Sequence, residues 1–210
     1  MDEQKIKISG EPKAAGSPSA VGKRRGDWAV LFHDLVYILA AVVLVFTFFI
    51  RMSRVEGNSM YPTLVNHDRM LLLSNIWYTS PQRGDIVVAR IPDFSDDPIV
   101  KRVIAVEGDT VFIDFDNGVV YVNGIALSEP YVKEPTYRSF EQNGMTYPLV
   151  IEKGHVFLMG DNRNDSTDSR YAVIGQVDQR CILGKAIFIT VPGKDSETGS
   201  RDPGRFGLID

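Results

Sequence analysis

TVFIDFDNGVVYV, at residues 110–122, contains two short runs of β-branched and aromatic residues separated by Asp116-Asn117-Gly118. Asn-Gly supplies the positive φ values that a tight turn needs, so this stretch predicts two antiparallel strands joined as a hairpin. A second turn is expected directly afterwards, at Asn123-Gly124. The stretch therefore predicts that the region around it is built of β-strands.

Further runs of the same kind lie on both sides of this hairpin. They are separated by Gly, Pro, Asn and Asp, which end strands and begin turns. The runs are Ile86–Ala89, Ile99–Val106, His155–Met159 and Ile182–Val191. We expect residues 51–192 to form one mainly antiparallel β domain, in which residues 129–148 are a surface loop. Residues 193–210 are expected to be a flexible C-terminal tail.

A long apolar run precedes the β domain. It extends from Trp28 to Ile50, 23 residues, interrupted near its start by one histidine and one aspartate. A helix of this length covers roughly 34 Å, enough to cross the hydrocarbon core of a bilayer. A cleaved secretory signal is the main alternative, but Arg51 follows the run in place of a small-residue cleavage site. A buried soluble helix would show a polar face, which this run lacks. We predict an uncleaved transmembrane anchor at residues 28–50.

Charge is distributed unevenly along the chain. Residues 1–27 carry six basic and four acidic groups and almost no aromatics, which predicts a disordered tail. Four basic residues before the anchor and three closely after it favour a cytoplasmic tail and an extracytoplasmic β domain. Residues 51–210 carry 17 basic and 22 acidic groups, so no footprint for nucleic acid is expected. Cys181, the single cysteine, excludes an intramolecular disulfide and is predicted to be a buried structural thiol.

Ser59 is the candidate nucleophile, in the segment GNSMYPTL at residues 57–64. It lies nine residues past the anchor, so an extended chain keeps it within about 30 Å of the membrane exit point. A serine hydroxyl needs an adjacent base. The only histidines are His33, His67 and His155, and no serine lies in a Gly-x-Ser-x-Gly elbow. A Ser-His-Asp arrangement through His67 or His155 stays open as an alternative.

Lys101 is the other candidate base. It lies in the apolar run Ile99–Val106, where its ammonium group would be desolvated if it pointed inward. Burial disfavours the charged form, and lowering the pKa from about 10.4 to about 8 takes roughly 3 kcal/mol. Taken by itself, a lysine in a strand more often holds its amine in solvent. The choice between these readings depends on the rest of the chain.

Five segments in fixed order resemble the type I (leader) signal peptidases of bacteria, and the resemblance covers nearly everything from the anchor onward. The segment with Ser59 resembles the family's nucleophile box, and the segment with Lys101 resembles its base-bearing box. Each segment alone is weakly specific, but all five in order are very specific. They are residues 57–64, 68–70, 83–87, 101–109 and 160–170.

The resemblance implies roles for single residues. Ser59 would attack the scissile carbonyl, and its backbone amide would stabilise the oxyanion. Lys101, neutral, would take the serine proton and return it to the leaving amine. Ser166 would hydrogen-bond Lys101 and hold it in place. Some family members add a serine hydroxyl two positions before the nucleophile, but Gly57 stands there in this chain, as in the enzymes of Gram-positive bacteria.

The last of the five segments is rich in acidic residues. The resemblance implies that Asp168 and Arg170 form a structural ion pair beneath the site and that Asp161 orders the loop. Calcium is the alternative for such a loop, but the EF-hand spacing fails, with Ser166 where glycine belongs and Ala172 where glutamate belongs. We expect no metal. No cofactor is implied either, because the serine and lysine supply both proton transfers.

The fold and function that the resemblance implies can now be stated. We expect a coiled catalytic sheet, with a smaller β region at residues 110–158. The protein would be a membrane-anchored serine endopeptidase that removes signal peptides from exported preproteins outside the cytoplasmic membrane, after small residues in an A-x-A-like pattern. Its partners would be preproteins and the lipid bilayer, and no oligomeric state is predicted. Met60, Trp77 and Tyr78 are placed either in the core or at a rim facing the bilayer.

Two functions of other classes are weighed against this one. A self-cleaving protease of the repressor type shares serine-lysine chemistry, but it would need a DNA-binding segment and no membrane span. A catalytically inert, membrane-tethered binding module would explain the anchor and the β domain. The joint presence of Ser59, Lys101 and Ser166 argues against the inert module.

Overall fold

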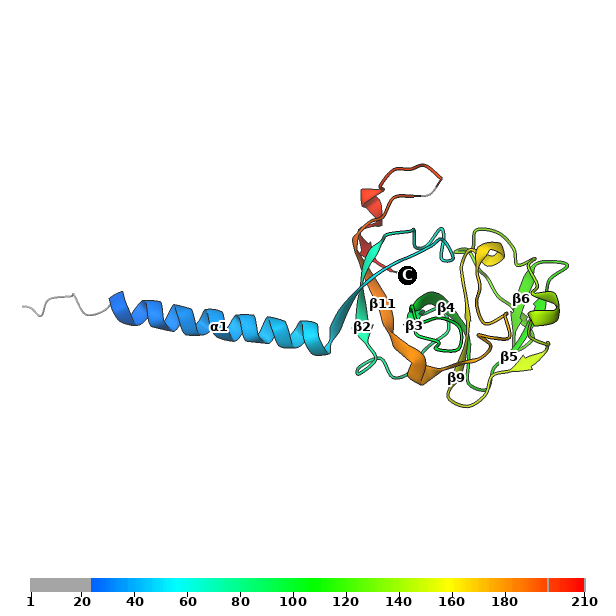
Figure 1. The fold of residues 1–210 in the computed structure, drawn as a ribbon, viewed down its shortest axis with the longest axis horizontal. Coiled ribbons are helices and arrows are strands. Elements are labelled where there is room, and N and C mark those ends of the chain that lie inside the picture. Colours follow the sequence, from blue (N-terminus) through cyan, green and yellow to red (C-terminus); the bar gives the residue numbers. More distant parts are fainter. Residues whose placement is uncertain (1–23, 196, 210) are drawn as a thin grey trace, which may run out of the picture. The chain divides into compact units, whose positions relative to one another are not determined.

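A computed structural model describes residues 24–195 and 197–209; most of the predicted N-terminal tail, residues 1–23, lies outside the described residues. Helix α1 (Arg24–Phe48) contains all but the last two residues of the apolar run (Figure 1). Its segment Trp28–Phe48 has a mean hydropathy of 2.4 and no buried residue, and by length and composition it could cross a membrane. The helix begins four residues before the predicted anchor, within the predicted disordered tail. It ends two residues before the predicted anchor does, because Ile50 begins a strand.

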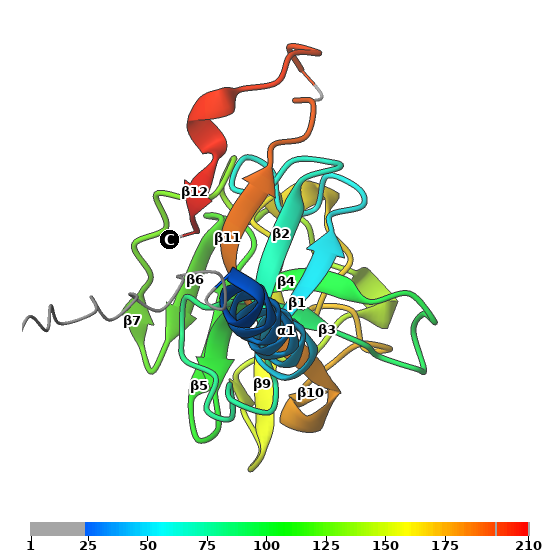
Figure 2. The ribbon, with the colours of Figure 1, turned by 90° about the vertical axis from the view of Figure 1, so that its left-hand side faces the viewer.

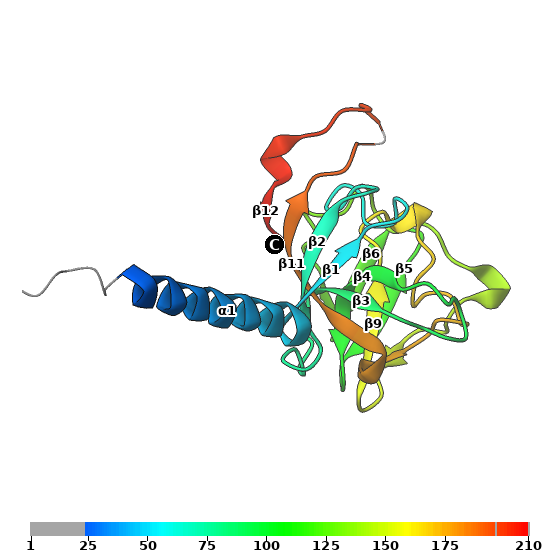
Figure 3. The same cartoon turned by 60° about the vertical axis from the view of Figure 1, so that its left-hand side comes forward.

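The larger of two sheets has eight strands, and all of their pairings are antiparallel (Figure 3). Two strands at its centre carry four and five consecutive buried residues; the four in one strand are all apolar, whereas the five in the other include Lys101 and Arg102. Strand β12 pairs with β11 beside the main path. In order, the strands are β1 (Ile50–Arg54), β2 (Arg69–Ser74), β11 (Ile182–Val191), β3 (Ile86–Ala89), β4 (Ile99–Val106), β9 (His155–Met159) and β10 (Val177–Asp178), with β12 at Gly207–Leu208.

The smaller sheet contains four short strands. These are β7 (Ile125–Ala126), β6 (Val119–Val122), β5 (Thr110–Asp114) and β8 (Leu149–Val150). The predicted smaller region extended to residue 158, but strand β9 belongs to the larger sheet. Residues 156–159 of β9 are buried, and the strand lies between β4 and β10. Burial on both faces places it within a covered sheet, which periodicity alone cannot reveal.

The two Asn-Gly turns of the first stretch differ in geometry. Asn123 and Gly124 both have positive φ, 54° and 76°, and they join β6 to β7 as a two-residue turn. At the first turn only Gly118 has positive φ, 73°. Residues 115–118 form a longer loop. In it, the Asp114 carboxylate accepts hydrogen bonds from the backbone N–H groups of Asp116 and Asn117. The hairpin prediction is therefore confirmed, with a looser first turn.

The C-terminal segment is packed against the domain, where the sequence led us to expect a flexible tail. Strand β12 pairs with β11 at residues 188–189 (Figure 2). The Arg205 guanidinium donates to the buried Asp68 carboxylate at 2.8 and 3.1 Å, and the Gly193 N–H donates to the same carboxylate at 2.6 Å. These long-range partners come from the β1–β2 loop, so no local pattern in residues 193–210 indicates them. Four short 3₁₀ helices complete the described secondary structure: η1 (Glu141–Asn143), η2 (Arg163–Asp165), η3 (Gln179–Cys181) and η4 (Pro203–Arg205).

Candidate active site

Ser59 lies in the loop between β1 and β2, and main-chain contacts fix this loop at both ends. Val55 N–H donates to Asp68 O at 2.8 Å, and Asn162 N–H donates to Ser59 O at 3.0 Å. Met60, the residue after Ser59, is 1% exposed and packs in the core beneath the loop. The loop is therefore held by an apolar side chain at the position next to the hydroxyl. A place for Met60 at an exposed rim is excluded.

Lys101 lies in β4, opposite Val87 of β3. Its side chain is buried, and its Nζ lies 2.6 Å from Ser59 Oγ and 3.0 Å from the carbonyl oxygen of Val100. Burial lowers the pKa of Lys101 to about 8. The charge of Asp168 acts against this lowering, and the charge of Arg170 adds to it. A serine oxygen and an amine of reduced basicity are thus in direct contact inside the domain.

Arg102, the residue after Lys101, connects strand β4 through Asp161 to the loop that carries Ser59, called the nucleophile loop below. Arg102 is buried and donates two parallel hydrogen bonds to Asp161, at 2.9 and 2.8 Å. Thr63, four residues after Ser59, donates to the same carboxylate at 2.5 Å. The Arg102 guanidinium also lies over the ring of Tyr131, 4.0 Å from its centroid. The carboxylate of Asp161 therefore joins the elements that carry Lys101 and Ser59.

Ser166 contacts a different partner from the one predicted. Its hydroxyl donates to Asp168 at 2.7 Å, and none of the hydrogen bonds among the described residues joins it to Lys101. Asp168 also accepts Gly160 N–H at 2.9 Å and forms a bidentate ion pair with Arg170. Burial alone would raise the pKa of Asp168, but Arg170 and these hydrogen bonds lower it. These donors occupy the Asp168 carboxylate. The amine of Lys101 instead hydrogen-bonds Ser59 Oγ and the Val100 carbonyl.

Gly160 lets these segments approach one another. A Cβ atom at this position would overlap both the Ser166 hydroxyl and the backbone carbonyl of Ser59. The absence of a side chain is thus the reason that the loop after β9 can pass directly beneath the nucleophile.

The contacts of Arg163 with Glu129 and Thr136 could not be predicted from the sequence. Arg163 is fully buried and donates to both carboxylate oxygens of Glu129, at 2.8 and 2.5 Å, and to Thr136 Oγ1 at 3.0 Å. Residues 129–136 were expected to form part of a surface loop, yet they anchor the loop after β9. Glu129 and Arg163 are 34 positions apart, so spacing does not indicate the pair.

The Ser59 backbone N–H donates to no acceptor within the described residues. A Cβ atom added to Gly57 would meet nothing within 4 Å, so there is open space beside this part of the loop. A free donor next to open space is the local arrangement that an oxyanion site requires.

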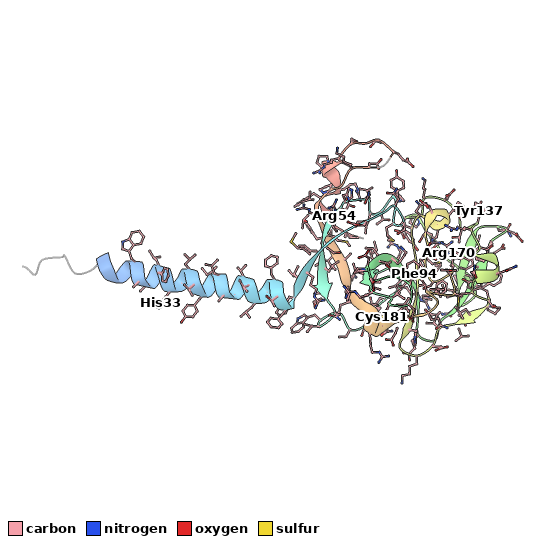
Figure 4. All side chains as sticks on the ribbon, viewed as in Figure 1. His33, Arg54, Phe94, Tyr137, Arg170 and Cys181 are labelled. Atoms are coloured by element: carbon pink, nitrogen blue, oxygen red, sulfur yellow. The ribbon has the colours of Figure 1, made fainter. Side chains whose placement is uncertain are left out.

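A cleft of about 410 Å³ opens over Ser59 and Lys101. Its two walls come from consecutive residues of the chain: 53–56, at the end of β1 and just after it, and 97–101, just before β4 and at its start. Phe94 and Arg54, both labelled in Figure 4, also line it. Apolar and polar side chains both line the cleft; the apolar ones include Val55, Met60, Val88, Phe94, Ile99 and Val100.

Neither histidine of the β domain, His67 or His155, belongs to this site. His67 accepts a hydrogen bond from Arg54, His155 contacts the carbonyl of Lys153, and neither lines the cleft. In the part of the chain that the structure describes, no group of three or more His, Cys, Asp or Glu residues is arranged to hold a metal ion. The histidine alternative therefore has no geometric support.

Comparisons with known proteins agree on one family. The family described as "Signal peptidase, peptidase S26" matches residues 27–191. Signal peptidase I of Bacillus amyloliquefaciens is 34% identical over 190 residues, covering 88% of this chain and 96% of the relative. A probable signal peptidase I-1 of Synechocystis sp. is 34% identical over 177 residues, covering 79% and 85%. The likeness thus extends beyond Gram-positive bacteria.

Solved structures give one further comparison. The crystal structure of a signal peptidase I from Enterococcus faecalis V583 is 32% identical to this chain. It aligns with 50% of this chain and 96% of its own, with a TM-score of 0.42.

Proposed function

Because the chain belongs to the signal peptidase family, peptidase S26, we propose that Ser59 and Lys101 are the pair with which it cuts its substrates. As a member of this family it is a serine endopeptidase that cleaves signal peptides from preproteins. The observation that supports the pair is the 2.6 Å contact between Lys101 Nζ and Ser59 Oγ, at a buried amine whose pKa is lowered to about 8.

In the proposed reaction, Ser59 Oγ attacks the carbonyl carbon of the scissile peptide while neutral Lys101 accepts the hydroxyl proton. The tetrahedral intermediate collapses, the C–N bond breaks, and the ammonium of Lys101 returns the proton to the leaving amine. Lysine, neutral again, then takes a proton from a water molecule that attacks the ester of Ser59. The carboxyl group of the signal peptide leaves, and the serine regains its proton.

The negative charge of the intermediate would be stabilised by the Ser59 backbone N–H, which has no other acceptor among the described residues. Gly57 supplies no hydroxyl at the position where some family members have serine. Open space beside Gly57 leaves room for a donor from the substrate or from water to complete the site.

The remaining site residues are proposed to act through position. Ser166 would orient the lysine indirectly, through the Asp168 carboxylate, because its hydroxyl bonds that carboxylate. The Asp168–Arg170 pair supports the floor of the site. Asp161 holds Arg102, and therefore the backbone next to Lys101, in register with the nucleophile loop. No cofactor takes part in this scheme.

The place of action is proposed from the helix and the charges. We place α1 across the cytoplasmic membrane as a single-pass anchor, with the N-terminus inside and the β domain outside. Preprotein substrates would lie extended between the two walls of the cleft, and its apolar lining would favour small side chains before the cut.

Ser59→Ala tests the proposal. The full chain in detergent should lose about 10³-fold or more of its activity toward a preprotein, because the attacking oxygen is gone while the volume hardly changes. Mass spectrometry or sequencing of the new N-terminus measures the product. Ser139→Ala, an exposed serine outside the cleft, is the matched control and should cleave like the wild type. Near-normal cleavage by a folded Ser59→Ala protein would remove Ser59 from the mechanism.

A further inference from the structure

A second hollow, of about 560 Å³, lies at the ends of β1, β2 and β11. Four cationic side chains line it, together with a histidine and a valine: Arg54, Arg69, Lys194 and Arg201, with His67 and Val191. Arg54 also lines the active-site cleft, so the two cavities share a wall. We propose that this cationic hollow binds the phosphate group of an anionic lipid headgroup. The choice of lipid rests on the membrane anchoring proposed above.

The first observation is that these cations lack carboxylate partners. None of the four forms an ion pair with another residue in the described ranges, although eight ion pairs occur elsewhere in them. The neighbouring carboxylates are engaged. Asp68 is buried and accepts from Arg205, and Asp195 accepts N–H groups of its own turn. None of the four cations of the hollow is therefore held in an ion pair within the described residues.

The second observation is the register of the sheet. Arg54 of β1 stands directly opposite Arg69 of β2, and Val191 of β11 is opposite Arg69 on its other side. Like charges directly opposite on antiparallel strands destabilise a sheet. Arg54 donates to His67 Nδ1, an acceptor that carries no negative charge and so does not compensate the two guanidinium groups. An anion bound between the two guanidinium groups would remove the repulsion and accept charge-assisted hydrogen bonds from both.

The third observation concerns where such an anion is available. Arg54 lies six residues after Phe48, the last residue of α1, so an extended chain places it within about 22 Å of the end of the span. Exposed apolar residues occur in this part of the domain: Val191 lines the hollow, Leu208 lies in β12, which pairs with β11, and Phe206 directly precedes β12. Cations beside exposed apolar side chains match a bilayer surface, where phosphates lie next to the acyl boundary.

The test uses the full chain in micelles of a neutral detergent. Arginine side-chain N–H signals in NMR spectra are followed while phosphatidylglycerol, phosphatidylcholine or inorganic phosphate is added. Phosphatidylglycerol should shift the signals of Arg54, Arg69 and Arg201 saturably, and added salt should weaken its binding. The proposal is overturned if phosphatidylcholine or inorganic phosphate saturates these signals at the same concentration, or if a poly-glutamate peptide does so.

The double variant Arg69→Gln/Arg201→Gln should weaken phosphatidylglycerol binding, followed at Arg54, by about tenfold or more, because two charge-assisted contacts are lost. Arg90→Gln/Lys153→Gln removes two exposed cations that have no ion pair among the described residues and lie outside the hollow, and it should bind like the wild type. Equal weakening in both variants would reduce the effect to net charge and refute the site. Cleavage of a soluble peptide in detergent should be unchanged in both, which separates this proposal from that of the catalytic pair.

Discussion

Two lysines stand on opposite sides of the same residue, and their surroundings differ. Lys101 of β4 and Lys185 of β11 are both opposite Val87 of β3. Lys185 is partly exposed and pairs with Asp85 at 2.5 Å, whereas Lys101 is buried and contacts only a hydroxyl and a carbonyl among the described residues. Burial lowers the pKa of Lys101 to about 8. For Asp85, burial would raise the pKa, but the bonds from Lys185 and Tyr78 outweigh it and lower the pKa.

The difference teaches that the sheet position does not decide what a lysine does. A carboxylate within hydrogen-bond reach stabilises the ammonium form of a lysine. Where no such carboxylate is present, burial has the largest effect on the pKa of the lysine and lowers it. Near Lys101 the carboxylates of Asp161 and Asp168 are already neutralised by Arg102 and Arg170. The buried carboxylates beneath the site are therefore each paired with an arginine, and neither forms an ion pair with Lys101.

Exchanging each lysine for a permanent cation should break the comparison most clearly. Lys101→Arg cannot give up its proton, so kcat/KM toward a preprotein should fall about 10³-fold or more. Lys185→Arg keeps the ion pair with Asp85 and should retain activity within a few-fold. Steady-state cleavage in detergent measures both. Comparable losses in the two variants would mean that Lys101 is not the base.

The pH dependence of cleavage sharpens the comparison. Because the proposed mechanism requires the neutral form of Lys101, kcat/KM should rise with pH and level off above about 8. Well below that value it should fall about tenfold per pH unit, so from pH 8, where about half of the lysine is neutral, to pH 6 the fall should be about 50-fold. The rising limb should persist in Lys185→Arg. A flat profile from pH 6 to pH 9 in the wild type would contradict the assignment.

The smallest effect should appear in stability, with opposite signs for the two lysines. The unfolded lysine keeps its proton up to about 10.5 and the folded one only to about 8, so the wild-type free energy of unfolding should rise with pH between these values. At pH 7 Lys101→Met should therefore be more stable than the wild type by about 1 to 3 kcal/mol, and it should lack the rise. Lys185→Met should instead lose about 1 kcal/mol, because Asp85 loses its cation. Urea unfolding in detergent, followed by circular dichroism, measures both.

The parts of the fold that could be predicted are those encoded locally. The strands follow β-branched runs, the span follows a run of apolar residues, and Gly118 and Gly124 occupy positive-φ positions as expected. Sheet membership could not be predicted for β9, because a run of apolar residues looks alike in either sheet. The packing of the C-terminal segment was missed because its partner, Asp68, is more than 100 residues away in the chain.

The structure bears on the geometry of the predicted site, while the catalytic roles of its residues stay predictions. Ser59 and Lys101 were chosen from an ordered set of segments, and the structure brings their side chains together. The expected bond from Ser166 to Lys101 is replaced by one to Asp168, which lies only two residues further along the chain. Of the three residues considered for the membrane rim, Met60 is buried, Tyr78 bonds Asp85, and Trp77 is exposed and stacks on Phe49. An apolar residue type does not reveal which way its side chain points.

The tight approach at Gly160 has a consequence for how the gene can vary. Every missense change at that codon adds a Cβ atom, and the space it would need is occupied by the Ser166 hydroxyl and the Ser59 carbonyl. Neither obstacle is the flexible end of a long side chain, so the nucleophile loop itself would have to move. A chain drifting under relaxed selection would therefore lose its chemistry by one substitution here while keeping Ser59 and Lys101 intact. Among sequences that still carry both residues, we therefore expect the active ones to keep glycine at this position.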